Sequence, residues 1–337
     1  MVQGEGRCPV WRLLQDGLSE AVHFSKQLAE RRDKGIEMID VCLLGTGGMM
    51  PLPGRHLTAL LLRHQGHSVL IDCGEGTQVA IRKYGWSMHS IDAILFTHVH
   101  GDHVAGISGL LSSMNTEGRR EPVHIYGPDA VEEVVASLCV VVGVNFEVHF
   151  HRVGKMPFSV GALQVTPFPV KHNITCYGYR VDLPRRPKFL PEKAKALQIP
   201  ITDWRKLQAG ESVMVGLRRV RPEEVSGPER RGLSIVYSTD TRPCATLERA
   251  AKDCDLLITE GIYGDREKTK SAEEKCHMTA WEAADLAARA GAKETWLTHY
   301  SPSFRNPAQY ADEMARKNSS VRFASDGWKR VLDFEED

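Results

Sequence analysis

The most restrictive feature of this 337-residue sequence is a run of metal-binding residue types, THVHGDH at 97–103, directly after the apolar stretch IDAILF at 91–96. A short apolar run of this kind predicts a buried β-strand. Side chains alternate along a strand, so His98 and His100 would point to the same side, and the following glycine turn would bring the other two ligands towards them. The four candidate ligands are His98, His100, Asp102 and His103. An isolated histidine is more often an ordinary surface or core residue, but neutral imidazoles and a carboxylate at this density are what Zn²⁺ accepts.

Three further residues of ligand type stand at the ends of later strand-like runs. They are His172 after LQVTPFPVK, Asp240 after SIVYST and His299 after TWLT. Singly, each favours a structural role; together they supply what a site for two metal ions needs, because α/β sheets gather ligands at strand ends. Asp72, after SVLI, is a fourth such carboxylate. It would either bind metal or orient a ligand histidine through a hydrogen bond.

The order of apolar runs predicts a layered α/β fold. Strand-like runs occur at 38–44, 57–63, 68–72, 91–96, 123–126, 146–152, 162–169, 233–238, 255–259, 294–298 and 321–323, and helical patterns at 76–84, 103–114, 128–141, 243–252, 277–290 and 306–317. Two β-rich halves with interleaved helices predict two sheets packed together and covered by helices. We expect one domain over 38–337, preceded by an N-terminal extension at 1–37 that is helical or poorly ordered.

A segment between the two halves, 183–232, breaks this rhythm. It holds six of the chain's 17 prolines and 12 Lys or Arg against 6 Asp or Glu. Such a long connection without strand or core patterns predicts a protruding, partly ordered arm. Its basic excess favours contact with phosphate, although a solvated loop with incidental charge is the alternative.

Composition limits the class of protein. The chain has 43 Lys plus Arg and 43 Asp plus Glu, so a role with nucleic acid requires a local basic surface. The eight cysteines are scattered without a C-x-x-C pair, as expected of reduced thiols. No apolar run approaches the roughly 18 residues of a membrane span, and the N-terminus has no signal-peptide pattern. We therefore expect a cytoplasmic protein without a membrane partner.

The strand-end residues and the stretches around them resemble the ribonuclease Z family of the metallo-β-lactamase superfamily. The matching stretches are LLGTGG, IDCGEGTQ, LFTHVHGDHVAGISGLL, VKHNITCYGYR, PEKAKALQIP, VSGPERRG, YSTDTRP, CHMTAWEAADLA and LTHYSP, in family order from residue 42 to the C-terminus. The resemblance implies an α/β fold, the metallo-β-lactamase αββα sandwich, with the arm inserted between its two halves.

The resemblance also implies a two-metal site with specific ligands. One zinc would be held by His98, His100 and His172, and the other by Asp102, His103 and His299, with Asp240 bridging them and a hydroxide between the metals. Mn²⁺ or Fe²⁺ could replace Zn²⁺ at ligands of this type. Two metals at such a site generate a nucleophile at neutral pH and stabilise an in-line displacement, which makes phosphodiester hydrolysis the implied reaction.

Two residues gain catalytic roles from the resemblance. Asp102 would accept the proton of the nucleophile. His277, at the start of an amphipathic helix pattern, would face the scissile phosphate and stabilise charge or protonate the leaving ribose oxygen. The alternative for His277 is an ordinary residue at a helix N-terminus.

The implied function is removal of the 3′ trailer from precursor tRNA by a homodimer, leaving a 3′-hydroxyl on the tRNA. The arm would grip the RNA, through arginines that the sequence singles out as Arg218, Arg219, Arg221, Arg230 and Arg231. The chain departs from the family at 47–58, where a Pro-x-Lys-x-Arg-Asn loop that handles the CCA end is common. The alternative function is therefore hydrolysis of small or cyclic phosphodiesters by the same metals.

Overall fold

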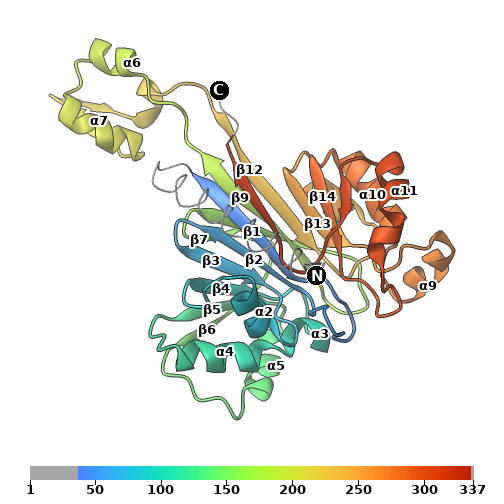
Figure 1. Cartoon of the computed structure of the whole chain (residues 1–337). Helices are drawn as coiled ribbons and strands as arrows, with labels where there is room; N and C mark the ends of the chain where they lie inside the picture. The colour runs from blue at the N-terminus through green and yellow to red at the C-terminus, as the bar shows by residue number, and fades with distance from the viewer. Residues whose placement is uncertain (1–36, 335–337) are drawn as a thin grey trace, which may run out of the picture.

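The computed structural model describes residues 37–334, which form two seven-stranded β-sheets packed face to face, with helices on both outer surfaces (Figure 1). The predicted αββα sandwich is therefore confirmed. The predicted N-terminal extension, 1–37, lies outside the described residues except for Glu37.

The first sheet has the strand order β16-β1-β2-β3-β4-β5-β6. Its strands are β1 Met38–Gly45, β2 Ala59–His64, β3 His67–Ile71, β4 Ile91–Leu95, β5 Val123–Gly127, β6 Val148–Arg152 and β16 Trp328–Asp333. Helices α2 (Thr77–Lys83), α4 (Ile107–Thr116) and α5 (Val131–Leu138) cover its outer face through a buried apolar cluster.

The second sheet has the order β15-β14-β13-β12-β9-β8-β7. Its strands are β7 Phe158–Val160, β8 Leu163–Pro169, β9 Tyr177–Arg185, β12 Arg230–Ser238, β13 Leu256–Glu260, β14 Glu294–Thr298 and β15 Val321–Phe323. Helices α8 (Ala245–Ala250), α10 (Ala280–Ala290) and α11 (Ala311–Lys317) cover its outer face in the same way.

Alternating side chains explain why the sheets form two layers. In β2, Leu60 and Leu62 point into the space between the sheets, where Val181 and Ile235 meet them from the other sheet, while Leu61 points to the helices. Each of these side chains is fully buried. A strand buried on both faces has a nearly continuous apolar sequence, which is why these runs were recognisable as strands.

Three strands of the two sheets were not predicted: β7, β9 and β16. Strand β9 carries Gly178, Asp182 and Pro184, residue types that are infrequent in strands, and its end falls within the segment predicted to be an arm. Strand β16 mixes Lys329, Arg330 and Asp333 with its apolar residues. Tertiary pairing with β12 and β1 overrides these weak local preferences.

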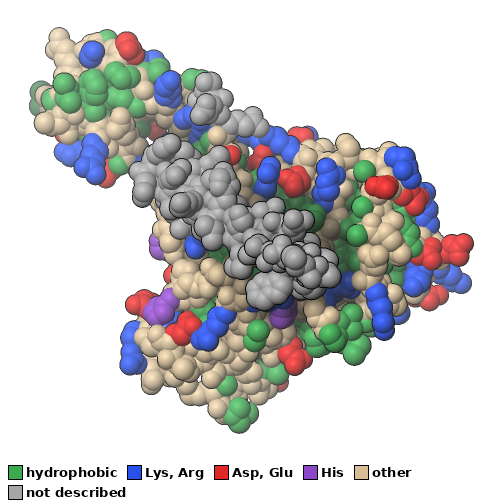
Figure 2. Space-filling view, viewed as in Figure 1, with side chains coloured by type: hydrophobic (Ala, Val, Ile, Leu, Met, Phe, Trp, Pro, Cys, Tyr) green, Lys and Arg blue, Asp and Glu red, His purple; other side chains and the backbone are tan. Residues whose placement is uncertain are grey.

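Residues 186–229, called the arm below, project from the sandwich (Figure 1). The arm contains α6 Pro191–Ala196, α7 Ile201–Gln208, β10 Val213–Val215, β11 Arg218–Val220 and the 3₁₀-helix η1 Pro222–Val225. The arm has a small buried core of its own, formed by Ala194, Ile199, Leu207, Val213, Val220 and Val225. Lys, Arg and hydrophobic side chains share its surface in Figure 2.

The ends of the predicted segment 183–232 belong to the sheet. Arg185 of β9 pairs with Arg230 of β12, so the strand ladder continues to the root of the arm. Predicted RNA contacts Arg230 and Arg231 therefore lie in β12, where Arg231 binds Asp255 with an Nη1–Oδ1 distance of 2.7 Å. Without these strand ends, the arm has nine basic against six acidic residues.

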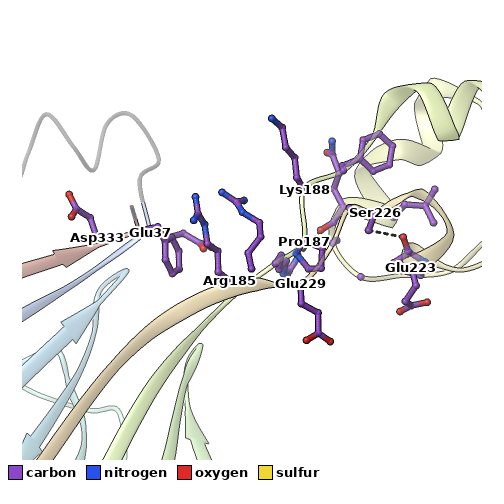
Figure 3. Close-up of a pocket in the computed structure, with 18 residues that line it drawn as sticks. Glu37, Arg185, Pro187, Lys188, Glu223, Ser226, Glu229 and Asp333 are labelled. Carbon is purple, nitrogen blue, oxygen red and sulfur yellow. Dashed lines mark hydrogen bonds between the residues drawn. The ribbon is translucent and has the colours of Figure 1, made fainter. Parts of the chain in front are cut away.

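A cavity of about 1310 Å³ opens at the root of the arm, between Glu37 and Asp333 on one side and Lys188 and Glu229 on the other (Figure 3). None of the predicted metal ligands lines it. Between residues 37 and 334, no helix has the length and apolar character that crossing a membrane requires.

Candidate metal centre

The predicted ligands all follow strands, and the sandwich brings these strand ends together. His98 follows β4 of the first sheet, while His172, Asp240 and His299 follow β8, β12 and β14 of the second. In the opening motif, His100 is the N-cap of the short helix α3 (Gly101–Val104), and this helix carries Asp102 and His103. The centre therefore lies across one edge of the sandwich and takes ligands from both sheets.

The first ligand group consists of His98, His100, His172 and one oxygen of Asp240. Nδ1 of His100 lies 3.0 Å from Nε2 of His98 and 3.3 Å from Nε2 of His172. Asp240 Oδ2 lies 3.6 Å and 3.8 Å from the same two Nε2 atoms. Tetrahedral ligands at 2.0–2.1 Å from one Zn²⁺ are about 3.3 Å apart, so these separations suit a shared ion.

The second group consists of Asp102, His103, His299 and the other oxygen of Asp240. Nε2 of His103 and Nε2 of His299 are 3.3 Å apart, and Asp102 Oδ2 lies 3.7 Å and 3.4 Å from them. Asp240 Oδ1 lies 3.1 Å from the first of these nitrogens and 3.2 Å from the second. Each carboxylate oxygen of Asp240 thus faces a different histidine set.

The residues fit a pair of divalent cations. Asp240 is 2% exposed and its Oδ1 accepts no hydrogen bond, although two ring nitrogens lie close to it. Burial opposes its ionisation, but the surrounding histidines hold the pKa of this carboxyl well below its usual range. Burial lowers the pKa of His98, and that of His172 to about 4, which favours the neutral imidazoles that bind metal.

Asp72 orients a ligand rather than facing the ligand groups. Its carboxylate accepts hydrogen bonds from the backbone N–H of Thr97 at 2.9 Å and from the Tyr237 hydroxyl at 3.2 Å, and it contacts His103 Nδ1 at 2.9 Å. Burial disfavours a charged His103, but Asp240 and Asp72 raise its pKa well above the usual value. Of the two roles left open for Asp72, this geometry matches the second.

His277 lies at the edge of the same centre, paired with a residue that the sequence did not single out. Its Nδ1 is 3.0 Å from Oε2 of Glu260 and 4.0 Å from Oδ2 of Asp240. Burial lowers the pKa of His277, but Glu260 outweighs it and the pKa is raised to about 9. Glu260 is the last residue of β13, fully buried, and its Oε1 accepts the Thr241 N–H at 2.5 Å.

Helix α10 begins later than predicted. Thr279 is its N-cap and forms a capping box with Glu282, so His277 precedes the helix. Arg242 donates to the His277 backbone carbonyl at 2.6 Å and pairs with Glu282. The capping box and this arginine fix the position of the histidine backbone.

The loop after β1 closes over the second ligand group. The Met49 N–H donates to Asp102 Oδ2 at 2.6 Å, and Met50 N–H donates to Gly48 O, which gives Met49 a φ of 70°. A side chain at Gly48 would come within 2.6 Å of the His299 ring, so only glycine fits there. Met49 and Met50 are each more than half exposed beside the centre.

Comparisons with known proteins agree with the fold. The family model "Anti-Pycsar protein Apyc1" matches residues 39–178, and the model "Beta-lactamase superfamily domain" matches 187–300. Human tRNase Z, short form, has a similar structure, with a TM-score of 0.62 and 23% identity over 88% of this chain and 100% of that one. The metallo-β-lactamase-fold protein YhfI from Bacillus subtilis is equally similar, with a TM-score of 0.64 and 21% identity over 88% of this chain and 100% of that one. The fold is therefore that of the metallo-β-lactamases.

Sequence relatives narrow the class to one family. Ribonuclease Z of Lachnoclostridium phytofermentans is 46% identical, over 88% of this chain and 99% of the relative. Ribonuclease Z of Lachnospira eligens is 44% identical, over 89% of this chain and 100% of the relative. The chain belongs to the ribonuclease Z family, as its sequence motifs predicted.

Proposed function

We propose that the protein is the metal-dependent endoribonuclease that removes the 3′ trailer from precursor tRNA and leaves a 3′-hydroxyl on the tRNA. Membership of the ribonuclease Z family supports this activity. The observation that carries the mechanism is the placement of Asp240, whose two carboxylate oxygens face two separate sets of histidines.

The chain's residues would hold two divalent ions. We assign His98, His100 and His172 to one ion, and Asp102, His103 and His299 to the other, with Asp240 shared between them. Bound Zn²⁺, or Mn²⁺ or Fe²⁺, supplies Lewis acidity and lowers the pKa of water so that it can attack phosphorus at neutral pH.

Asp102 and His277 would transfer the protons, and Glu260 would orient His277. Asp102 accepts the proton of the attacking water, and the Met49 N–H holds its Oδ2 in place. His277 faces the opposite end of the reaction and donates its Nε2 proton to the leaving 3′ oxygen. Glu260 accepts from His277 Nδ1 and keeps the ring protonated and oriented for that transfer.

The arm is proposed to grip the RNA away from the cleaved bond. Arg219 and Arg221 are exposed there, whereas Arg218 is partly neutralised by Glu224 at 2.6 Å. Arm residues Ile201, Met214 and Leu217 are also strongly exposed and would contact ribose or bases. We further propose a cytoplasmic homodimer in which the arm of one subunit serves the RNA bound by the other.

Hydrolysis of small or cyclic phosphodiesters is the second candidate. It is favoured by the loop at 47–58, which lacks the Pro-x-Lys-x-Arg-Asn pattern and in which Met49 and Met50 are exposed beside the centre.

Product mapping on precursor tRNA distinguishes the two candidates. With one precursor that encodes CCA and one that does not, we expect a single cut at the 3′ side of the mature sequence and a 3′-hydroxyl on the tRNA product. His100→Ala and Asp240→Ala should remove both the cut and the bound metal. Efficient turnover of a cyclic or small phosphodiester without precursor cleavage would overturn the first candidate, and unchanged turnover in both variants would overturn the metal assignment.

A further inference from the structure

A polar cluster centred on the Tyr263 hydroxyl lies beside His277 and has no part in the function proposed above. The phenol oxygen accepts a hydrogen bond from Lys275 Nζ at 3.4 Å and interacts with the hydroxyls of Ser271 and Ser301. Ser303 Oγ is 3.0 Å from Ser301 Oγ and extends the cluster to the surface. Four of these five side chains are neutral hydroxyl groups and the fifth is a cation.

Backbone hydrogen bonds fix this cluster against the metal centre. The Ala280 N–H donates to Tyr263 O at 2.9 Å, and the Ser301 N–H donates to Ile262 O at 3.1 Å. Lys275 precedes His277 by two residues, and Ser301 follows the ligand His299 by two. The cluster therefore lies next to the site on the side of His277.

The local electrostatics favour an anion. Tyr263 is only 5% exposed, and its burial raises the pKa of the phenol. Hydrogen bonds from Lys275, Ser271 and Ser301 outweigh burial, and the pKa is lowered. A second ammonium, Lys268 Nζ, lies 5.0 Å from the centre of the Tyr263 ring. Groups that stabilise negative charge on a phenol oxygen also stabilise it on a phosphate.

We propose that Lys275, Tyr263 and Ser303 bind a second phosphate of the RNA, the phosphodiester one nucleotide to the 5′ side of the cleaved bond. The assignment of side rests on the proposed function, in which His277 faces the leaving 3′ oxygen. The nucleotide that carries this oxygen continues in the 5′ direction past His277, towards the cluster. Lysine and hydroxyl side chains are common donors to phosphate oxygens, and such contacts set the register of a nucleic acid without reading its sequence.

A charge-removal experiment on both partners tests the contact. Precursor tRNA is prepared with a neutral methylphosphonate at that linkage, and kcat/KM is measured for the wild type and Lys275→Ala. We expect the neutral linkage to lower kcat/KM of the wild type about tenfold, and Lys275→Ala to lower kcat/KM on the unmodified RNA by about the same factor. When the variant acts on the neutral linkage, kcat/KM should fall by less than a further twofold, because both changes remove the same contact. Tyr263→Phe should give a smaller, partly shared loss.

Matched controls keep the result specific. Lys270 is exposed on helix α9 (Thr269–Glu274), and Lys275 is the C-cap of that helix. Lys270→Ala should therefore respond to the methylphosphonate as the wild type does. Thermal melting checks that each variant is folded. If the wild type cleaves the precursor but the methylphosphonate lowers kcat/KM equally in the wild type and in Lys275→Ala, the proposed phosphate contact is wrong. Absence of any precursor cleavage by the wild type would instead overturn the proposed function and this inference with it.

Discussion

The metal centre and the arm differ in how their residues are held. The predicted ligands lie at strand ends or, for Asp102 and His103, in the short helix α3, and each lies close to other ligands or to buried carboxylates. The arm, by contrast, has a core of six small or medium apolar residues and keeps most of its charged side chains in solvent. The positions of the predicted ligands follow from the way the two sheets pack, whereas the arm was recognised from its proline and charge content.

This difference bears on how residues were assigned to the two regions from the sequence. In the candidate centre, each ligand assignment was read from a position at or shortly after the end of a strand. In the arm, basic residues have no such constraint. Two of the five arginines assigned to it, Arg230 and Arg231, lie in β12 at its root.

The largest effect is expected in the centre. Asp240→Ala should abolish hydrolysis of both precursor tRNA and bis-p-nitrophenyl phosphate, a loss larger than the ~10²–10³-fold that follows removal of one electrostatic donor from an active site. The reason is that the variant removes an oxygen from both ligand groups at once. The measurements are the turnover of both substrates and the metal content of the Asp240→Ala variant by mass spectrometry. Retention of two metals with normal turnover would contradict the shared-ligand role.

Replacing residues 189–226 of the arm with a short Gly-Ser linker should separate the two regions. Both strands of the root remain, because the Gly227 N–H still donates to Lys188 O. We expect kcat/KM for precursor tRNA to fall by about a hundredfold, since several phosphate contacts are lost together. Hydrolysis of bis-p-nitrophenyl phosphate should be retained. Equal losses on both substrates would mean that the arm supports the fold of the centre rather than RNA binding.

Glu260→Gln probes the edge of the centre and should have an intermediate effect. The amide keeps the shape of the side chain but removes the charge that raises the pKa of His277 to about 9. We expect kcat for precursor tRNA to fall by roughly tenfold to a hundredfold, within the range for general acid catalysis. Glu248→Gln, at an exposed pair with Arg289, is the matched control. A loss in the control of similar size would argue against a role through His277.

The smallest effects should distinguish arginines of the arm from those of its root. Arg219→Ala combined with Arg221→Ala should raise KM for precursor tRNA a few-fold and reduce the slope of log KM against log salt by about 1 per lost phosphate contact. Arg231→Ala should instead lower the free energy of unfolding by about 1 kcal/mol, because it breaks the pair with Asp255. Salt titrations and thermal melts measure the two. If Arg231→Ala instead raised KM and lowered the salt slope while the double variant did not, the RNA would be bound at β12 rather than by the arm.

The sequence predicted the sandwich, because buried strands leave an apolar signal, and it suggested seven ligands, because residues of ligand type stand at or just after the ends of these strands. Strand β9 was not predicted, because it is a strand through its pairing with β8 and β12 rather than through the strand preference of its own residues. Glu260 could have been found, since it ends the apolar run LLIT as Asp240 ends SIVYST. It was missed because a glutamate at the end of a single strand has no neighbouring ligand in the sequence; its partner His277 is 17 residues away.

Strands β9 and β12 connect the arm directly to the metal centre. Each has nine residues; β9 begins five residues after His172, and β12 ends two residues before Asp240. At about 3.3 Å per residue, the paired strands keep the root of the arm about 30 Å from the ligands. The arm is therefore held at a fixed distance from the ligands of its own chain. In the proposed homodimer, where each arm would serve the RNA bound by the partner, the spacing between the gripped region and the cleavable bond would be set by these paired strands together with the contact between the subunits.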